Sequence, residues 1–270
     1  MDLLEVDKVS RFFQTPGKKE DYCVFSNVSL EVREKEYVSV LGHSGCGKST
    51  LLNIIAGIDQ ATSGYVFLDG KEVTEPGLDR MVVFQNFALM PWLTVWGNIR
   101  IAVKAAHSDW NRRRINEWVQ RYVDMVGLTG AETKRPAELS GGMRQRVGLA
   151  RAFCVEPRIL LLDEPFAQID ALTRGVIQEE LVRMWLETGI TIFMVTHDVD
   201  ESILLSDRIM LMSPGPDARI MEEIKVDIPR PRARTTIIEH PQYYAIRNRI
   251  IRFLSRKEDL APAKPMKEVA

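Results

Sequence analysis

Residues 42–49 combine three glycines, a lysine and two serines in a spacing that suits phosphate binding. The segment reads Gly-His-Ser-Gly-Cys-Gly-Lys-Ser and matches the pattern G-x-x-x-x-G-K-S. Glycines let backbone N–H groups turn toward a phosphate without Cβ clashes, and a following helix presents its N-terminus to the anion. We expect Lys48 to reach the β- and γ-phosphates and the Ser49 hydroxyl to bind Mg²⁺. The predicted nucleotide-binding residues are Gly42, His43, Ser44, Gly45, Cys46, Gly47, Lys48, Ser49 and Thr50.

Two adjacent acids, Asp163 and Glu164, end the apolar run Ile159–Leu162. In a parallel sheet, ligands bind at the carboxyl ends of the strands. We expect Asp163 to hold the hydration shell of Mg²⁺, and Glu164 to polarise a water for in-line attack on the γ-phosphate. The alternative is a pair of acids that cap the next helix, and the phosphate loop elsewhere in the chain argues against it.

A second candidate anion site lies at residues 139–145, which read Leu-Ser-Gly-Gly-Met-Arg-Gln and precede an expected helix. Ser140 can cap that helix, and Gly141 and Gly142 allow a ligand to approach the backbone closely. Because helix N-termini attract anions, this segment predicts a second phosphate contact.

A sheet with helices around it must position these segments. Apolar, bounded runs predict strands at Leu3–Val9, Val24–Val32, Tyr37–Leu41, Gly64–Leu68, Met81–Gln85, Ile159–Leu162 and Thr191–Val195. Helical spacing and capping signals predict helices at Ser49–Ala56, Arg113–Val126, Gln145–Cys154, Gly175–Glu187 and Tyr243–Leu254. Short, fully apolar strands that alternate with helices are typical of a parallel sheet covered on both faces.

The composition fits a globular protein of 270 residues, with 45% hydrophobic and 27% charged residues. A formal net charge of −1 gives no bulk attraction to nucleic acid, so no nucleic-acid partner is expected. The cysteines, Cys23, Cys46 and Cys154, are far apart and form no disulfide framework, which favours a reducing compartment. No apolar run approaches the roughly 20 residues of a membrane-spanning helix, and no signal peptide is recognisable. We expect the protein to reach a membrane only through a partner.

Together, the motifs resemble those of the ATP-binding-cassette (ABC) ATPases, over about residues 3 to 225. Met143 replaces the usual glutamine of the family's signature, a variant common in importer ATPases. The resemblance implies an α/β fold, the P-loop NTPase ABC cassette, with a mixed-sheet core, an antiparallel β subdomain and a small helical subdomain. It implies an ATPase domain over residues 1–228, with the helical subdomain at about 86–138, and a C-terminal tail over 229–270. ATP and Mg²⁺ are the implied cofactors.

The same resemblance assigns roles to single residues. Phe13 looks like the aromatic that stacks on adenine, although it can also be a core aromatic, and Tyr22 is a second candidate. Gln85 looks like the glutamine that contacts Mg²⁺ and water, which makes Ser49, Gln85 and Asp163 the implied metal site. His197 looks like the switch histidine that holds the γ-phosphate. The implied catalytic residues are thus Glu164, His197 and Gln85.

Each ATP site in this family is formed by two chains, because the nucleotide lies between the phosphate loop of one chain and the signature of its partner. Ser140, Gly141, Gly142 and Gln145 are the residues expected to act across the dimer. Asp170 looks like the aspartate of the D-loop, although Gln168 and Ile169 depart from the family's usual sequence. The partner can be a second copy of this chain or a related ATPase chain.

Several classes of ABC protein share these motifs. A chromosome or DNA-repair ATPase would carry a long coiled coil, and a translation factor would carry a second phosphate loop; neither is present. The implied class is the importer ATPase, which works on separate permease subunits at the cytoplasmic face of the bacterial inner membrane and indirectly with a solute-binding protein. The apolar segment Phe87–Trp96 suits permease docking, although about half of its side chains can be core.

Four segments are similar to the nitrate/sulfonate/bicarbonate branch of the importers: residues 42–47, 76–85, 170–175 and 228–232. His43 and Thr173-Arg174-Gly175 look most like the nitrate and bicarbonate transporter ATPases. The implied function is ATP-driven uptake of a small anion, with nitrate or nitrite first, and bicarbonate or taurine and alkanesulfonates as alternatives. Because the cassette does not touch the transported ion, this assignment rests on resemblance alone.

Overall fold

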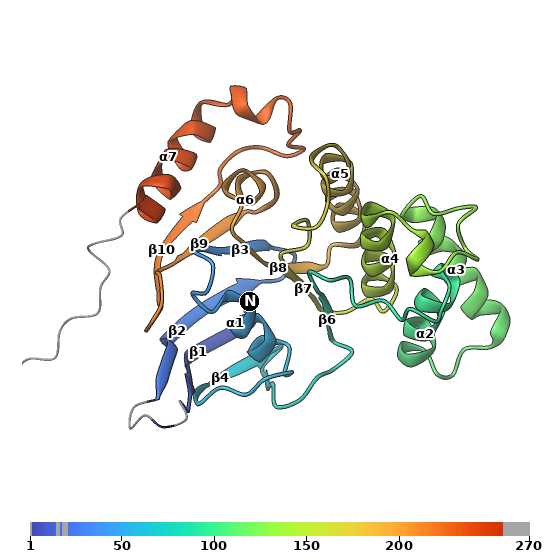
Figure 1. Ribbon diagram of the computed structural model, residues 1–270, viewed down its shortest axis with the longest axis horizontal. Coiled ribbons are helices and arrows are strands. Elements are labelled where there is room, and N and C mark those ends of the chain that lie inside the picture. Colours follow the sequence, from blue (N-terminus) through green and yellow to red (C-terminus); the bar gives the residue numbers. More distant parts are fainter. Residues whose placement is uncertain (1, 15–16, 18–20, 256–270) are drawn as a thin grey trace, which may run out of the picture.

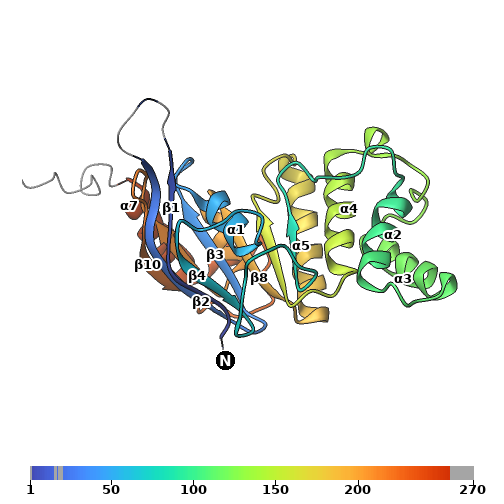
Figure 2. The same ribbon diagram turned by 90° about the horizontal axis from the view of Figure 1, so that it is seen from below.

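In the computed structural model, residues 2–14, 17 and 21–255 are described. The chain forms two sheets, and a group of helices lies beyond one end of the larger sheet (Figure 1). Seen from the perpendicular direction, the molecule is elongated, with the strands toward one end and α2 to α4 toward the other (Figure 2).

The larger sheet has six strands in the order β10-β9-β3-β8-β7-β6. The strands are β3 (Tyr37–Gly42), β6 (Arg80–Val83), β7 (Ile159–Asp163), β8 (Thr191–Thr196), β9 (Arg208–Met212) and β10 (Ile220–Lys225). Neighbouring strands from β9 to β6 are parallel, and β10 pairs antiparallel at the edge. All residues of β3 and β8 are buried, as expected for central strands covered on both faces.

The side chains of β3 divide the interior into two cores. Tyr37 and Leu41 belong to the core on the helical side, whereas Val38 and Val40 belong to the core shared with the smaller sheet. This alternation is the period-two pattern of a strand. The sheet is therefore the middle layer of the molecule.

The smaller sheet is antiparallel, with the strand order β2-β1-β4-β5. Its strands are β1 (Asp2–Phe13), β2 (Tyr22–Arg33), β4 (Ser63–Leu68) and β5 (Lys71–Glu72). Between the two sheets lies α1 (Lys48–Ile55), whose buried side chains Leu51, Leu52 and Ile55 join the core of the smaller sheet. The mixed-sheet core and the antiparallel β subdomain thus match the expected fold.

Residues between β6 and β7 form the helical part, with α2 (Val95–Ala106), α3 (Arg112–Met125), the short 3₁₀ helix η1 (Pro136–Glu138) and α4 (Gly141–Phe153). The side chains of Thr94 and Asn111 cap α2 and α3 by accepting backbone N–H groups. In α3, Ile115, Val119 and Tyr122 are buried at the helical spacing that the sequence indicated.

The remaining helices are α5 (Ala171–Thr188), α6 (Val199–Leu205), η2 (Ile237–Glu239) and α7 (Pro241–Ser255). In Figure 1, α6 and α7 lie on the side of the larger sheet opposite the smaller sheet. Within the described residues, no helix has the length and apolar character needed to cross a membrane. The expected boundary near residue 228 between the ATPase domain and the tail stays a prediction.

Candidate active site

The phosphate loop joins β3 to α1 and has the backbone shape that its glycines predict. Gly45 and Gly47 adopt positive φ angles of 82° and 99°, which favour glycine. A Cβ atom on Gly47 would lie 2.6 Å from Val24 Cγ1, closer than real atoms approach. Both the backbone conformation and the lack of space for a side chain therefore require glycine at position 47.

Lys48 lies at the first position of α1, with only 5% of its surface exposed. Its Nζ donates hydrogen bonds to the main-chain carbonyls of Gly42 and His43, both at 2.9 Å. Among the described residues, no carboxylate pairs with this ammonium group. A buried cation that has only neutral acceptors favours an anionic ligand, and the loop fits a phosphate.

Ser49 and Asp163, which are 114 residues apart in sequence, meet beside this loop. Ser49 Oγ donates a hydrogen bond to Asp163 Oδ1 at 2.7 Å. Burial raises the pKa of Asp163, and the hydrogen bond from Ser49 opposes that rise. A hydroxyl and a carboxylate this close together offer the oxygen ligands that Mg²⁺ prefers, so the pair fits the expected metal.

Glu164 and His197 meet at the carboxyl ends of the neighbouring strands β7 and β8. His197 Nδ1 lies 3.1 Å from Glu164 Oε1. Glu164 has a φ of 43°, which is uncommon for a residue other than glycine, and its N–H donates to the carbonyl of Val195. Strained backbone of this kind is typical of functional sites, because surrounding contacts must hold it in place. Asp163, Glu164, His197, and the loop residues Lys48 and Ser49 thus lie at the carboxyl ends of three adjacent strands of the larger sheet, β3, β8 and β7.

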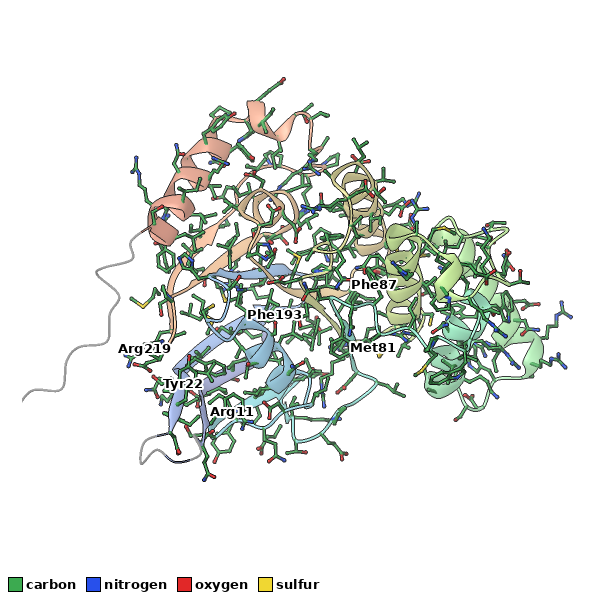
Figure 3. All side chains as sticks on the ribbon, in the orientation of Figure 1. Arg11, Tyr22, Met81, Phe87, Phe193 and Arg219 are labelled. Carbon is green, nitrogen blue, oxygen red and sulfur yellow. The ribbon has the colours of Figure 1, made fainter. Side chains whose placement is uncertain are left out.

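Gln85 lies outside β6, which ends at Val83, in an exposed turn. The sequence extended this strand to Gln85, and that boundary was wrong by two residues. The next residues are held by Arg151, which donates to the carbonyls of Phe87 and Ala88. In Figure 3, Phe87 lies beside α4, between the larger sheet and the helical part.

Phe13 and Tyr22 are opposite each other, where β1 ends and β2 begins. They are 44% and 48% exposed, so neither is a core aromatic. The Arg11 guanidinium lies 4.5 Å from the centre of the Phe13 ring, and Tyr22 lies near Arg219 in Figure 3. A Cβ atom placed on Gly215 would be 3.8 Å from the Tyr22 hydroxyl and 3.6 Å from the Gly45 carbonyl. Tyr22 therefore lies close to the phosphate loop and stays a candidate beside Phe13.

The signature segment forms the N-terminus of α4. Ser140 is exposed and caps the helix by accepting a hydrogen bond from the N–H of Met143 at 3.3 Å. A Cβ atom on Gly142 would lie 2.4 Å from Thr173 Cγ2, so glycine permits the close packing of α4 on α5. In the described residues, no hydrogen bond joins Ser140 to the phosphate loop of the same chain.

Gln145 does not lie on the surface with Ser140. It is fully buried, and neither its Oε1 nor its Nε2 has a hydrogen-bond partner among the described residues. The helix explains this position: Gln145 is five residues beyond Ser140, which turns it toward the interior. The expectation that Gln145 acts across a dimer is therefore corrected.

Asp170 caps α5, and its carboxylate accepts the N–H of Thr173 at 3.0 Å. This backbone hydrogen bond lowers the pKa of Asp170. The carbonyl of Gln168 lies 3.3 Å from where a Cβ on Gly141 would be, so the D-loop segment is adjacent to the start of the signature helix.

Asn98 is a structural residue that the sequence did not identify. It is fully buried in α2, its Oδ1 accepts the N–H of Met90, and its Nδ2 donates to the carbonyls of Met90, Leu93 and Thr94 at 3.0–3.2 Å. These bonds fold residues 90–94 back onto α2. Asparagine is a poor helix former, and because the sequence did not predict α2, no signal singled out Asn98.

A family model described as "ABC transporter" matches residues 25–167, which is more than half of the chain. This chain belongs to the ABC transporter family. The match includes the phosphate loop, the signature segment and the paired acids, so it confirms the family and the fold that the motifs predict.

Three curated ABC relatives are about half identical to this chain over the aligned residues. The nitrate import ATP-binding protein NrtC of Synechococcus elongatus is 51% identical over 94% of this chain, which spans 38% of that protein. The shorter NrtD from the same organism is 46% identical, with 94% of this chain and 92% of NrtD covered. The bicarbonate transport ATP-binding protein CmpD is 47% identical, with 93% and 90% covered. The chain thus spans about two fifths of NrtC but almost the whole of NrtD and CmpD.

A solved structure of the ATP-binding cassette MJ0796, a dimer in a post-hydrolysis state bound to ADP and Pi, has the same fold. The TM-score is 0.73 at 29% identity, and the match covers 84% of this chain and 100% of the cassette.

Proposed function

We propose that this chain is the ATP-hydrolysing subunit of an ABC importer that takes up a small anion. The observation that carries ATP hydrolysis is the convergence of Lys48, Ser49 and Asp163 with the 3.1 Å contact between Glu164 and His197. These groups supply a phosphate-binding cation, metal ligands and a base in one place.

Each side chain has a distinct task. Lys48 exchanges its two carbonyl acceptors for phosphate oxygens, because a charged acceptor gives the stronger hydrogen bond. Glu164 accepts a proton from the attacking water. His197 holds the γ-phosphate and, through its contact with Glu164, orients the carboxylate. Ser49 and Asp163, together with Gln85, would hold Mg²⁺, which would neutralise phosphate charge. Phe13 or Tyr22 stacks on the adenine ring.

Hydrolysis uses two chains. The signature residues Ser140, Gly141 and Gly142 close the site of a partner chain, and Asp170 lies next to them on the same surface. The absence of a hydrogen bond between Ser140 and its own phosphate loop, within the part of the chain described, supports this arrangement. The dimeric MJ0796 cassette gives a precedent.

The permease contacts the helical part on the cytoplasmic face of the membrane. Of the apolar segment Phe87–Trp96, Phe87 is buried, Leu89 and Trp96 pack partly on the core, and Trp92 is 67% exposed. An exposed tryptophan is a typical anchor for a protein partner, so Trp92 is the residue of this segment best placed to dock.

Nitrate is the proposed substrate, because NrtC and NrtD are nitrate import proteins. Bicarbonate is the second candidate, since CmpD is equally similar. Uptake of labelled nitrate and of labelled bicarbonate by cells that lack this chain separates the two: loss of only one uptake identifies the substrate.

Two substitutions test hydrolysis. Lys48→Ala removes the phosphate-binding charge and should weaken ATP binding in calorimetry.

Glu164→Gln should retain ATP binding, trap a closed dimer and abolish turnover, because the base is lost while the phosphate contacts stay. Wild-type turnover by Glu164→Gln would contradict the assigned base.

A further inference from the structure

The C-terminal helix α7 contacts both the phosphate loop and the helix that follows the switch histidine. At its carboxyl end, the main-chain carbonyl of Leu254 accepts a hydrogen bond from His43 Nε2 at 2.8 Å. At its amino end, Tyr243 Oη and Arg247 Nε both donate to Asp200 Oδ1 at 2.8 Å. Asp200 lies in the first turn of α6, three residues after His197. One helix therefore bridges two segments of the nucleotide site.

His43 takes part in two hydrogen-bond systems. Because the carbonyl of Leu254 can only accept a hydrogen bond, His43 Nε2 must carry the proton and donate that bond to α7. Its own carbonyl accepts from Lys48 Nζ at 2.9 Å and from the N–H of Cys46 at 3.3 Å. The residue that anchors α7 is thus also an acceptor for the phosphate-binding lysine.

The contact also gives a carbonyl at the end of α7 a hydrogen-bond donor. The last four carbonyls of a helix have no intrahelical donor, and Leu254 is the penultimate residue of α7. The His43 ring supplies a donor where the helix has none. This hydrogen bond therefore fixes the position of the His43 ring relative to the end of α7.

The helix is held firmly between these two ends. Tyr243, Ile246, Ile250 and Phe253 are buried, and Arg249 pairs with Glu222 on β10. Burial, together with the bond to Asp200, raises the pKa of Tyr243 to about 12. A helix of 15 residues is about 22 Å long, and its buried face keeps it in one orientation.

We propose that α7 is a positioning element of the ATPase site, which fixes the phosphate loop through His43 and the switch segment through Asp200. This inference rests on the proposed ATP hydrolysis. The two ends of α7 then act on different steps. The His43 end sets the loop that binds phosphate, whereas the Tyr243 end sets α6 and the His197 that precedes it.

Two substitutions in the full chain separate these steps. His43→Leu removes the donor at similar volume and should raise the KM for ATP about fivefold, with kcat changed less than about twofold. His43→Gln retains an amide donor and should restore a KM near that of the wild type. Tyr243→Phe removes only the hydroxyl and should lower kcat about twofold to fivefold, with little change in KM.

Tyr244→Phe is the matched control. Tyr244 is the neighbouring residue on α7, is 55% exposed and makes no side-chain hydrogen bond to the described residues. The same chemical change there should leave both kinetic parameters unchanged. Wild-type kinetics for both His43→Leu and Tyr243→Phe, or equal losses in Tyr243→Phe and Tyr244→Phe, would overturn the role of α7.

Linkage supplies a readout that does not depend on turnover. If α7 docking favours nucleotide binding, nucleotide must favour α7 docking by the same factor. We expect ATP to slow amide hydrogen exchange of α7 in the wild type and to slow it less in His43→Leu. Equal slowing in both proteins would refute the coupling. A wild type that binds ATP with this protection but does not hydrolyse it would refute the proposed function and leave the α7 coupling supported.

Discussion

Glu201 is a buried carboxyl group in the first turn of α6, four residues after His197. Gln178 Nε2 donates to its Oε2 at 3.4 Å, and its Oε1 has no partner among the described residues. Burial, followed by the nearby charge of Asp198, raises the pKa of Glu201 from 4.5 to about 8. The folded chain therefore holds a proton here that the unfolded chain loses at lower pH.

This shift predicts a pH dependence of stability. Between the two pKa values the folded state binds more protons than the unfolded state, so the free energy of unfolding decreases as pH rises, by up to about 1.4 kcal/mol per pH unit. Well below pH 4.5 and well above pH 8, Glu201 adds no pH dependence to the free energy of unfolding. Glu201→Gln should remove the contribution of Glu201 protonation to this pH dependence. The variant should therefore gain stability relative to the wild type as pH rises. Urea unfolding at several pH values measures it, and identical slopes in both proteins would contradict the prediction.

At the scale of elements, Asn98 fixes the path of residues 90–94 against α2. We expect Asn98→Asp to lower the free energy of unfolding by at least about 3 kcal/mol, because a carboxylate cannot donate to the three carbonyls that surround it. Asn111→Asp is a matched control, since Asn111 is exposed and caps α3, where aspartate serves equally well. Urea unfolding of both variants tests this, and equal stability of the two would show that the buried amide has no special role.

The elements with strong local patterns were predictable. The strands at 37–41, 159–162 and 191–195 and the helix at 113–126 were found from short apolar runs and helical spacing. The sequence did not identify α2, α6, β9 or β10 as elements. In α2, an asparagine and a glycine interrupt the helical pattern, and long-range packing overrides it.

The site was predictable to the extent that its residues lie in continuous motifs. The contact of Ser49 with Asp163 follows from two motifs at the carboxyl ends of β3 and β7, the strands on either side of β8. The bond from His43 to Leu254 spans 211 residues and uses a main-chain carbonyl, so no residue type signals it. Gln145 was misplaced because a motif gives spacing along the chain, whereas the helix decides which face a residue occupies.

At the scale of the whole molecule, docking to a permease should depend on Trp92. Trp92→Glu replaces an exposed aromatic side chain with a charge, so the fold should persist while membrane recovery with the permease decreases. Tyr65→Glu is the control, since Tyr65 is 56% exposed on β4 in the smaller sheet. Co-purification with the permease measures the effect. Undiminished recovery of Trp92→Glu would exclude this residue from the interface.

The proposed head-to-tail arrangement of two chains can be tested by mixing two inactive variants. Lys48→Ala disables the phosphate loop of its own chain, and Ser140→Arg places a bulky cation in the signature that serves the partner. A dimer with one chain of each kind has one site that carries both defects and one site that is intact. Random pairing in an equal mixture of the two variants produces such dimers in about half of the cases, so about a quarter of the wild-type sites become functional. ATP hydrolysis should therefore reappear on mixing, in rough proportion to those sites. A mixture as inactive as each variant alone would contradict a homodimer with shared sites, whereas activity in Ser140→Arg alone would show that the signature does not serve a partner.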